Sequence, residues 1–168
     1  MAILRYISIM FCFLFISCNN KSEYSKDDSS FYGIYLKEWN SLLCPKKILF
    51  EKYEKNSSFK IIIRGDTRFN IEGCENEVKE INQRIFTPIV SYTGKIDYDI
   101  KLIIDDSLEF KITSIDNKID TVFSGGRPGD FIIMNNISSF IVNGYKVDNS
   151  KTPLNIEIPT KTGKVLKK

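Results

Sequence analysis

The sequence predicts a mainly β domain, a small β-sandwich or barrel with one or two short helices, and an α+β arrangement stays open. Two observations lead to this fold class. Short runs in which apolar and polar residues alternate recur from residue 96 onward, with turn residues between them. Asn143-Gly144 is also a type I′ turn signal between two such runs. Short strands with regular turns are typical of a β-sandwich or a small barrel.

The first ordered elements are expected soon after residue 30. The alternation from Tyr32 to Leu36 predicts a short strand. The spacing of Leu36, Trp39 and Leu43 is that of one helix face, so a helical turn is expected next, and Pro45 ends it.

The middle of the chain carries one strand signal and one helix signal. The stretch 48–55 is ambiguous. The stretch 59–64 holds three consecutive isoleucines and is a predicted strand, which the Gly-Asp pair at 65–66 ends. The stretch 74–86 is a predicted amphipathic helix, with acidic residues early and an arginine late. Its apolar residues at helical spacing are Val78, Ile81 and Ile85.

The clearest hairpin lies between residues 96 and 113. Apolar residues from Ile96 to Ile104 alternate with mostly charged ones, a turn follows at 105–107, and the alternation returns from Leu108 to Thr113. The segment 125–130 is a predicted loop. Further predicted strands are 118–123, 131–134, 139–142, 145–147 and 154–158.

The N-terminus carries the most specific signal in the chain. Arg5 precedes an apolar run over 6–16, and then come the small residue Ser17 and Cys18. The run is about half of the roughly 20 residues that span a bilayer as a helix, so it fits a secretory signal. This order resembles the signal peptide of bacterial lipoproteins, whose lipobox ends at the modified cysteine. Phe15 departs from the leucine usual in the family at that position.

The resemblance covers about the first 20 residues, and no family is identified for the rest. It implies that 1–17 is removed and that Cys18 becomes the lipidated N-terminus, with a stable membrane anchor formed by several acyl chains. Asn19 favours the outer membrane, facing the periplasm, because aspartate there is the family's usual inner-membrane retention signal. An ordinary signal peptide with an incidental Cys18 is the alternative.

The resemblance also divides the mature chain and sorts its cysteines. The polar residues 18–30 form a flexible tether, 31–160 a single β-rich domain and 161–168 a basic tail. An exported protein reaches an oxidising compartment, so a disulfide is expected between Cys44 and Cys74. The closed loop of about 31 residues is worth roughly 3–4 kcal/mol in the chain-entropy model.

Composition limits the chemistry of the chain. There is no histidine, which excludes Ser-His-Asp and Cys-His catalysis, histidine-ligated zinc and the usual near-neutral proton shuttle. The net charge of +3 at pH 7 gives no case for nucleic-acid binding. We therefore expect no catalytic residue, no metal and no cofactor.

Acidic residues around the clearest hairpin are the main candidate for chemistry. Asp97 and Asp99 share a face of the predicted strand, roughly 7 Å apart by strand rise. Such a pair could serve an inverting glycosidase, or bind Ca²⁺ together with Asp105 and Asp106. The alternating charges along the strand favour a solvated strand face instead.

The expected function is that of a lipid-anchored periplasmic lipoprotein that binds another protein and is not an enzyme. Toxin immunity and enzyme inhibition are examples, by analogy of architecture alone. Arg127 and Asp130, in the predicted loop, are candidate contacts for that partner. Two alternatives stay open: a structural accessory of a secretion, conjugation or other envelope assembly, and a histidine-free glycan hydrolase using Asp97 and Asp99.

Overall fold

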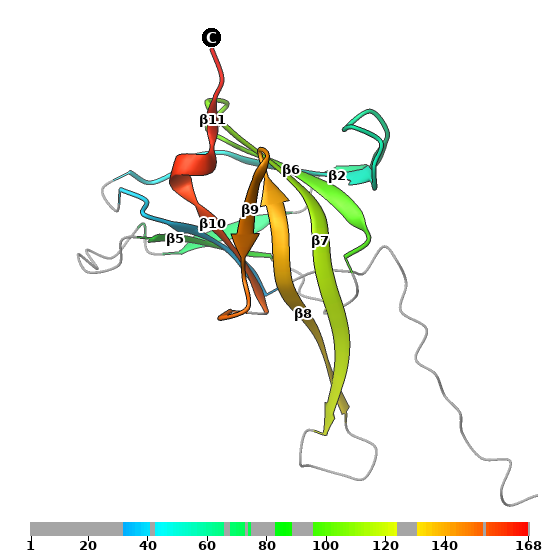
Figure 1. Ribbon diagram of the computed structural model, residues 1–168. Helices are drawn as coiled ribbons and strands as arrows, with labels where there is room; N and C mark the ends of the chain where they lie inside the picture. Colours follow the sequence, from blue (N-terminus) through cyan, green and yellow to red (C-terminus); the bar gives the residue numbers. More distant parts are fainter. Residues whose placement is uncertain are drawn as a thin grey trace, which may run out of the picture.

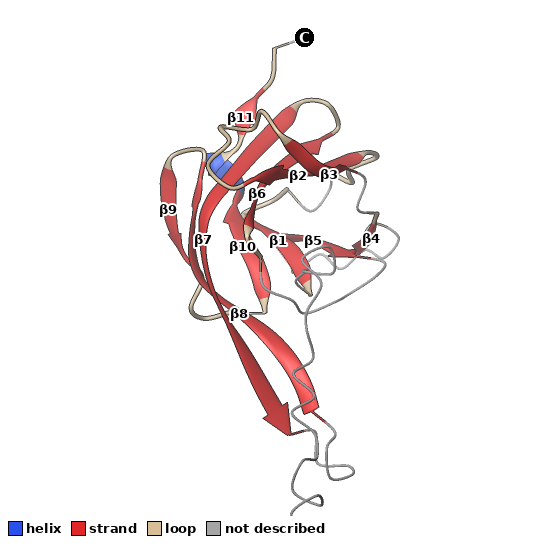
Figure 2. Ribbon diagram, turned by 90° about the vertical axis from the view of Figure 1, so that its right-hand side faces the viewer, coloured by secondary structure: helices blue, strands red, loops and turns tan. Residues whose placement is uncertain are grey.

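The chain folds into strands that form two sheets (Figures 1 and 2), as a computed structural model shows. The predicted mainly β fold is confirmed. The predicted signal peptide, Cys18, the predicted tether and the segment carrying Arg127 and Asp130 lie outside the described residues. The described residues are 32–40, 43–65, 68–72, 74, 83–88, 96–123, 131–152 and 154–167.

The structure describes eleven strands and one short helical element. The helical element among the described residues is a short 3-10 helix, η3 (Thr160–Thr162). The strands are β1 (Gly33–Lys37), β2 (Ile48–Glu54), β3 (Ile62–Gly65), β4 (Phe69–Glu72), β5 (Gln83–Pro88), β6 (Tyr98–Ile104), β7 (Leu108–Phe123), β8 (Phe131–Val142), β9 (Tyr145–Asp148), β10 (Asn155–Pro159) and β11 (Lys164–Val165).

The larger sheet has the order β3-β2-β6-β7-β8-β9, and β11 pairs with β7. The smaller sheet has the order β10-β1-β5-β4. All described pairs are antiparallel except β1 with β10, which run parallel from Gly33 opposite Asn155 to Lys37 opposite Pro159. Figure 2 shows the smaller sheet packed against one side of the larger one. The two sheets therefore form a sandwich, one of the two arrangements expected from the sequence.

One hydrophobic core lies between the two sheets. Alternate residues of the facing strands point into it, which is the period of two that a half-buried strand requires. Each fully buried isoleucine or phenylalanine stabilises the fold by about 1.5–3 kcal/mol relative to exposure, before entropy is counted. Core residues with no exposed surface include Ile34, Leu36, Phe86, Ile156 and Ile158 of the smaller sheet and Ile100, Leu102, Phe110 and Ile112 of the larger.

A buried amide joins the two sheets. The Nδ2 of Asn149 donates to the carbonyl of Ile137 in β8 at 2.9 Å and to that of Asn155 in β10 at 2.6 Å. Its Oδ1 accepts from the backbone N–H of Glu157 at 2.9 Å. A buried amide needs such partners, because an unpaired one costs free energy. Asn149 thus fixes the distance between the sheets at this end of the core.

The disulfide expected between Cys44 and Cys74 is present, with the two Cα atoms 5.5 Å apart. Cys44 precedes β2 of the larger sheet and Cys74 follows β4 of the smaller sheet. The bridge therefore links the two sheets covalently, near the ends of strands that belong to different layers.

The predicted hairpins are confirmed. β6 and β7 pair from Ile100 opposite Ile112 to Ile104 opposite Leu108. Asn143 and Gly144 have φ values of 48° and 88°, as a type I′ turn requires at both central positions. Four of the strands predicted separately are parts of two longer ones, β7 and β8. Their paired far ends extend beyond the rest of the sandwich (Figure 2).

The predicted helix over 74–86 is wrong where the structure describes it, because Gln83–Pro88 is strand β5. Pairing decides the outcome: Phe86, wholly buried, lies opposite Ile34 of β1 and Ile71 of β4. These partners are far away in the sequence, so the local helical spacing does not reveal them. Residues 75–82 lie outside the described residues.

Two further expectations concern the ends of the domain. The helical turn expected before Pro45 includes residues 41 and 42, which lie outside the described residues; on either side of them, the N–H of Leu43 donates to the carbonyl of Asn40 at 2.9 Å, and the Nε1 of buried Trp39 donates to the carbonyl of Leu43 at 2.7 Å. The predicted basic tail is partly attached to the fold. Lys164 and Val165 pair with β7, and the N–H of the next residue donates to the carbonyl of Ser107 at 2.8 Å.

Candidate interaction surface

The turn that joins β2 to β3 is tightly built. The N–H of Glu54 donates to the carbonyl of Ile61 at 2.9 Å, and the N–H of Ser57 donates to the carbonyl of Glu54 at 3.0 Å. Asn56, Ser58 and Phe59 all have positive φ, at 64°, 55° and 61°. A phenylalanine in this region is strained, and it persists only where surrounding contacts hold it.

The ring of Phe59 is held by side chains on the outer face of the larger sheet. It packs edge-to-face against Tyr53 of β2, with the ring centroids 5.3 Å apart. The Nζ of Lys111 in β7 lies 5.3 Å from the centroid of the same ring. These contacts are worth about 0.5–1.5 kcal/mol each, enough to offset much of the strain in the turn.

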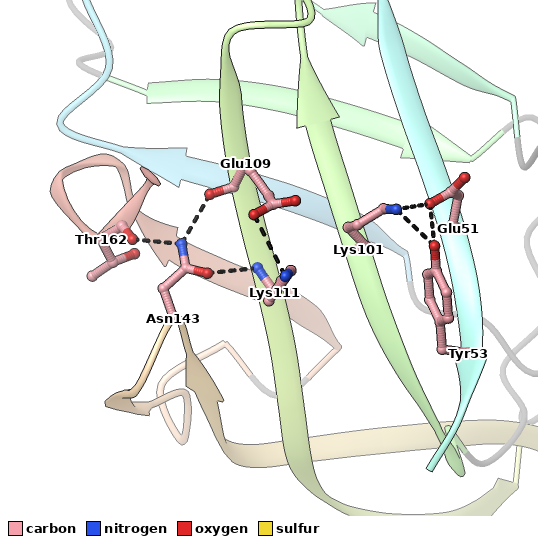
Figure 3. Close-up of polar contacts among 7 residues, drawn as sticks. All are labelled: Glu51, Tyr53, Lys101, Glu109, Lys111, Asn143 and Thr162. Carbon is pink, nitrogen blue, oxygen red and sulfur yellow. Dashed lines mark hydrogen bonds and ion pairs between the residues drawn. The ribbon is translucent and has the colours of Figure 1, made fainter. Parts of the chain in front are cut away.

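Tyr53, which contacts Phe59, belongs to a closed cluster of three polar side chains from β2 and β6 (Figure 3). The Nζ of Lys101 donates to the hydroxyl of Tyr53 at 2.6 Å, and that hydroxyl donates to Oε2 of Glu51 at 2.6 Å. Lys101 and Glu51 also form an ion pair. Glu51 lies directly opposite Lys101 in the β2–β6 register, which brings the opposite charges together.

The pKa values in this cluster follow from burial and pairing. Burial by itself would raise the pKa of Glu51, but the hydrogen bonds from Lys101 and Tyr53 outweigh it and lower the pKa. Burial would lower the pKa of Lys101, and the bonds to Glu51 and Tyr53 raise it instead. Burial and the bond to the Glu51 carboxylate raise the pKa of Tyr53. All three groups therefore keep their ordinary charge at neutral pH.

A second polar group on the same sheet fastens the C-terminal end of the chain (Figure 3). The Nδ2 of Asn143 donates to the carbonyls of Glu109 and Thr162, both at 2.8 Å. Its Oδ1 accepts from the N–H of Lys111 at 3.0 Å. The β8–β9 turn is thereby joined to β7 and to η3. The role of Asn143 is structural, because the bonds are all to backbone groups.

Asp99 anchors the β2–β3 turn from β6. Its side chain is 3% exposed, and its Oδ2 accepts from the N–H of Asn56 at 3.1 Å. Burial raises the pKa of Asp99, and the Asn56 bond and the charge of Lys55 offset only part of that rise. The expectation of a solvated face is therefore wrong for Asp99, because the turn covers it. Asp97 is only half-buried, so the two carboxylates lie in different surroundings.

The strand that follows the turn exposes an unusual run of apolar side chains. Lys52 pairs with Arg64, but the next residue of β2 pairs with Ile62, so Ile63 is the extra residue of a β-bulge. A bulge breaks the alternation of side chains between the two faces of a strand. Accordingly Ile61, Ile62 and Ile63 are all exposed, at 51%, 54% and 46%.

This run lies at the margin of the larger sheet. Among the described residues, β3 is a terminal strand that pairs only with β2 (Figure 2). Natural proteins commonly protect such edges with charged residues or proline. Here the exposed positions are isoleucines instead, and a contiguous exposed apolar surface marks an interaction site. We name the segment Lys60 to Ile63 the β3 edge.

Sequence reasoning found some parts of this surface and missed others. The three isoleucines were seen only as the core of a strand, because a bulge has no sequence signal here. The cluster of Glu51, Tyr53 and Lys101 was missed, since 48–55 was ambiguous and the cross-strand register was unknown. The placement of Cys18, Arg127 and Asp130 lies outside the described residues and stays a prediction.

Within the described part of the chain, Cys, Asp and Glu residues do not gather in groups of three or more that could hold a metal ion. The same part of the chain includes no helix with the length and apolar character needed to cross a membrane.

The chain matches no family model, no curated protein and no solved structure.

Proposed function

We propose that this protein is a lipid-anchored periplasmic lipoprotein whose domain binds another protein and is not an enzyme. The observation that carries the binding function is the β3 edge, where three consecutive isoleucines are exposed on a terminal strand. The turn before it is fixed by Asp99 and Phe59, so the surface is ordered before any partner arrives. A pre-ordered surface pays less conformational entropy on binding.

The lipid anchor is supported by the N-terminal sequence. Arg5, the apolar run and Ser17-Cys18 follow the order of a lipoprotein signal peptide. A non-enzymatic role is supported by the absence of histidine and by the position of Asp99, whose carboxylate holds a backbone N–H of the turn. Within this class, neutralising a toxin or inhibiting an enzyme in the cell envelope would need only a binding surface.

The anchor is tested with Cys18→Ala and, as its matched control, Cys12→Ala. Full-length protein expressed in a Gram-negative host is labelled with a radioactive fatty acid, and the outer membrane is then separated from the inner. We expect the label and the outer-membrane location to be lost in Cys18→Ala and kept in Cys12→Ala. Labelled Cys18→Ala protein would contradict the lipoprotein assignment.

The binding function is tested by cross-linking the full-length, detergent-solubilised protein in envelopes of its own organism. We expect one partner protein at a fixed stoichiometry, and reconstitution of the purified pair should reproduce the complex. A chain that stays alone in the envelope, at expression levels matching the native one, would contradict the proposal.

A further inference from the structure

We propose that the β3 edge binds an extended segment of the partner protein, apolar in its middle and acidic at its ends, which adds a strand to the larger sheet. This inference rests on the proposed protein-binding function and specifies how the partner is held. Strand addition of this kind takes affinity from main-chain hydrogen bonds and specificity from alternate side chains.

The backbone of β3 has bonding groups directed away from β2. The carbonyl of Ile61 accepts from Glu54, so Ile61 faces β2. In an antiparallel ladder successive residues face opposite sides, so the N–H and C=O of Ile62 point to the free side of the strand. Among the described residues β3 has no second strand neighbour to use them.

The side chains at this edge set the apolar character of the incoming segment. The three isoleucines expose about half of their surface, and a strand laid along β3 would cover part of each. Burial of apolar surface contributes about 25 cal/mol per Å². The bulge at Ile63 interrupts regular pairing along β3, so the added strand is expected to be short.

The charges beside the isoleucines select the ends of the segment. Lys60 is exposed on one side and position 64 is arginine on the other, while Lys55 adds a third positive charge in the adjoining turn. Opposite charges across paired strands stabilise them and like charges destabilise them. Two copies of this chain paired about Ile62 would set Lys60 against position 64, both basic, which disfavours self-association in that register.

A lipid surface could cover the isoleucines and attract the basic residues, but it could not form hydrogen bonds with the outward N–H and C=O groups of Ile62. Inside hydrocarbon, each unsatisfied N–H or C=O costs several kcal/mol, and open sheet edges are not found exposed to lipid. A peptide strand satisfies the backbone groups of Ile62 and covers the isoleucines as well. The observations therefore favour a protein segment over the membrane.

The test uses full-length protein in detergent micelles and short fluorescent peptides. One peptide alternates valine and threonine and has glutamate at both ends, and the other has lysine at both ends. Fluorescence anisotropy is expected to show binding of the glutamate-ended peptide, and binding of the lysine-ended peptide weaker by about tenfold or more, since 1.4 kcal/mol corresponds to a factor of ten. Equal binding of both peptides would overturn the charge assignment.

Four variants separate side-chain from backbone recognition. Ile62→Asp is expected to weaken binding of the glutamate-ended peptide by about tenfold or more. Ile62→Pro removes the outward N–H together with the isoleucine side chain, whereas Ile62→Ala removes most of the side chain and keeps the N–H. Edge strands tolerate proline, and Ile62→Pro is expected to weaken binding more than Ile62→Ala does. Val165→Asp changes another exposed β-branched residue, on β11, and is expected to bind as the unchanged protein does. Circular dichroism verifies that each variant is folded.

An affinity of Ile62→Pro equal to that of Ile62→Ala would overturn strand addition. So would an Ile62-dependent dimer in sedimentation, or Ile62-dependent binding of the Cys18→Ala form to phosphatidylglycerol vesicles without peptide binding. The two proposals fail separately. If Ile62→Asp captures the partner as well as the unchanged protein does, the proposed site at the β3 edge is refuted and the protein-binding function stands. If the peptide binds but no envelope partner is found, the protein-binding function is refuted and peptide binding at the β3 edge stands.

Discussion

At the scale of single residues, Asp99 explains how a charged side chain can be buried in a small sandwich. Its carboxylate lies under the β2–β3 turn, where burial raises its pKa, and it holds the N–H of Asn56. Without that bond the turn would lose an anchor beneath its strained Phe59. The residue therefore stabilises the turn while its charge costs free energy through desolvation.

Replacement of Asp99 separates these two effects. The pKa of Asp99 is raised in the folded protein, so protonation of Asp99 favours folding. This contribution to the free energy of unfolding is complete below the pKa of the unfolded state, and it is lost as the pH rises through the pKa of the folded state. Asp99→Asn keeps an oxygen that can accept from the N–H of Asn56, and it carries no charge. We therefore expect the stability of this variant not to fall between low and neutral pH on account of residue 99, and we expect it to be at least as stable as the unchanged protein near pH 7.

Asp99→Ala serves as the comparison, because it removes the acceptor as well as the charge. We expect it to be destabilised by about 1–3 kcal/mol near neutral pH, because the hydrogen bond from the N–H of Asn56 to a charged acceptor is lost. Urea unfolding between about pH 4 and pH 7 checks both variants. An Asn variant as unstable as the Ala variant would show that the acceptor contributes nothing.

At the scale of elements, the pairing of β2 with β6 joins strands that the chain connects through β3 and then through β4 and β5 of the smaller sheet. The Glu51–Lys101 ion pair lies in the middle of this pairing, with side chains 17% and 19% exposed. The Lys47–Asp106 ion pair, with N and O 2.9 Å apart, links the same part of the fold but is 61% and 60% exposed. Exposure should therefore decide which pair stabilises the protein.

Double-mutant cycles measure this difference. For Glu51→Gln with Lys101→Met we expect a coupling of about 1–2 kcal/mol, because the pair is shielded and shares the Tyr53 hydroxyl. For Lys47→Met with Asp106→Asn we expect about 0–0.5 kcal/mol. The Glu51 contribution should vanish as the pH falls through its lowered pKa. Equal couplings at neutral pH would mean that burial of the cluster has no energetic effect.

At the scale of the whole molecule, two devices hold the sheets together besides the shared core. Asn149 bonds to both layers at one place, and the Cys44–Cys74 bridge links them at another. The bridge closes a loop that contains β2, β3 and β4, so it constrains the unfolded chain as well as the folded one.

Removing the bridge should lower stability without changing the fold. For Cys44→Ser with Cys74→Ser we expect a loss of about 3–4 kcal/mol in the free energy of unfolding. The midpoint of guanidinium unfolding measures it, and a reducing agent should produce a similar loss in the unchanged protein and none in the variant. Reductant sensitivity that persists in the double variant would point to some other cause.

Local sequence signals predicted the hairpins, whereas strand β5 and the burial of Asp99 depend on contacts between residues far apart in the sequence. Alternation from Ile96 to Thr113 and the Asn143-Gly144 turn are contained in neighbouring residues, so the sequence alone sufficed for them. Strand β5 was missed because its partners lie elsewhere in the chain. The burial of Asp99 was missed because its cover comes from a turn more than 40 positions upstream.

The parallel pairing of β1 with β10 sets an order for the folding of this chain. β1 is the first described strand and β10 is the tenth, so their contact can form only when the whole segment between them is present. Such non-local pairing slows folding. Under the export proposed above, in which the chain would cross a membrane as an extended thread, this delay would have a benefit: the sandwich would close only after β10 has crossed, which would keep the chain unfolded during its passage.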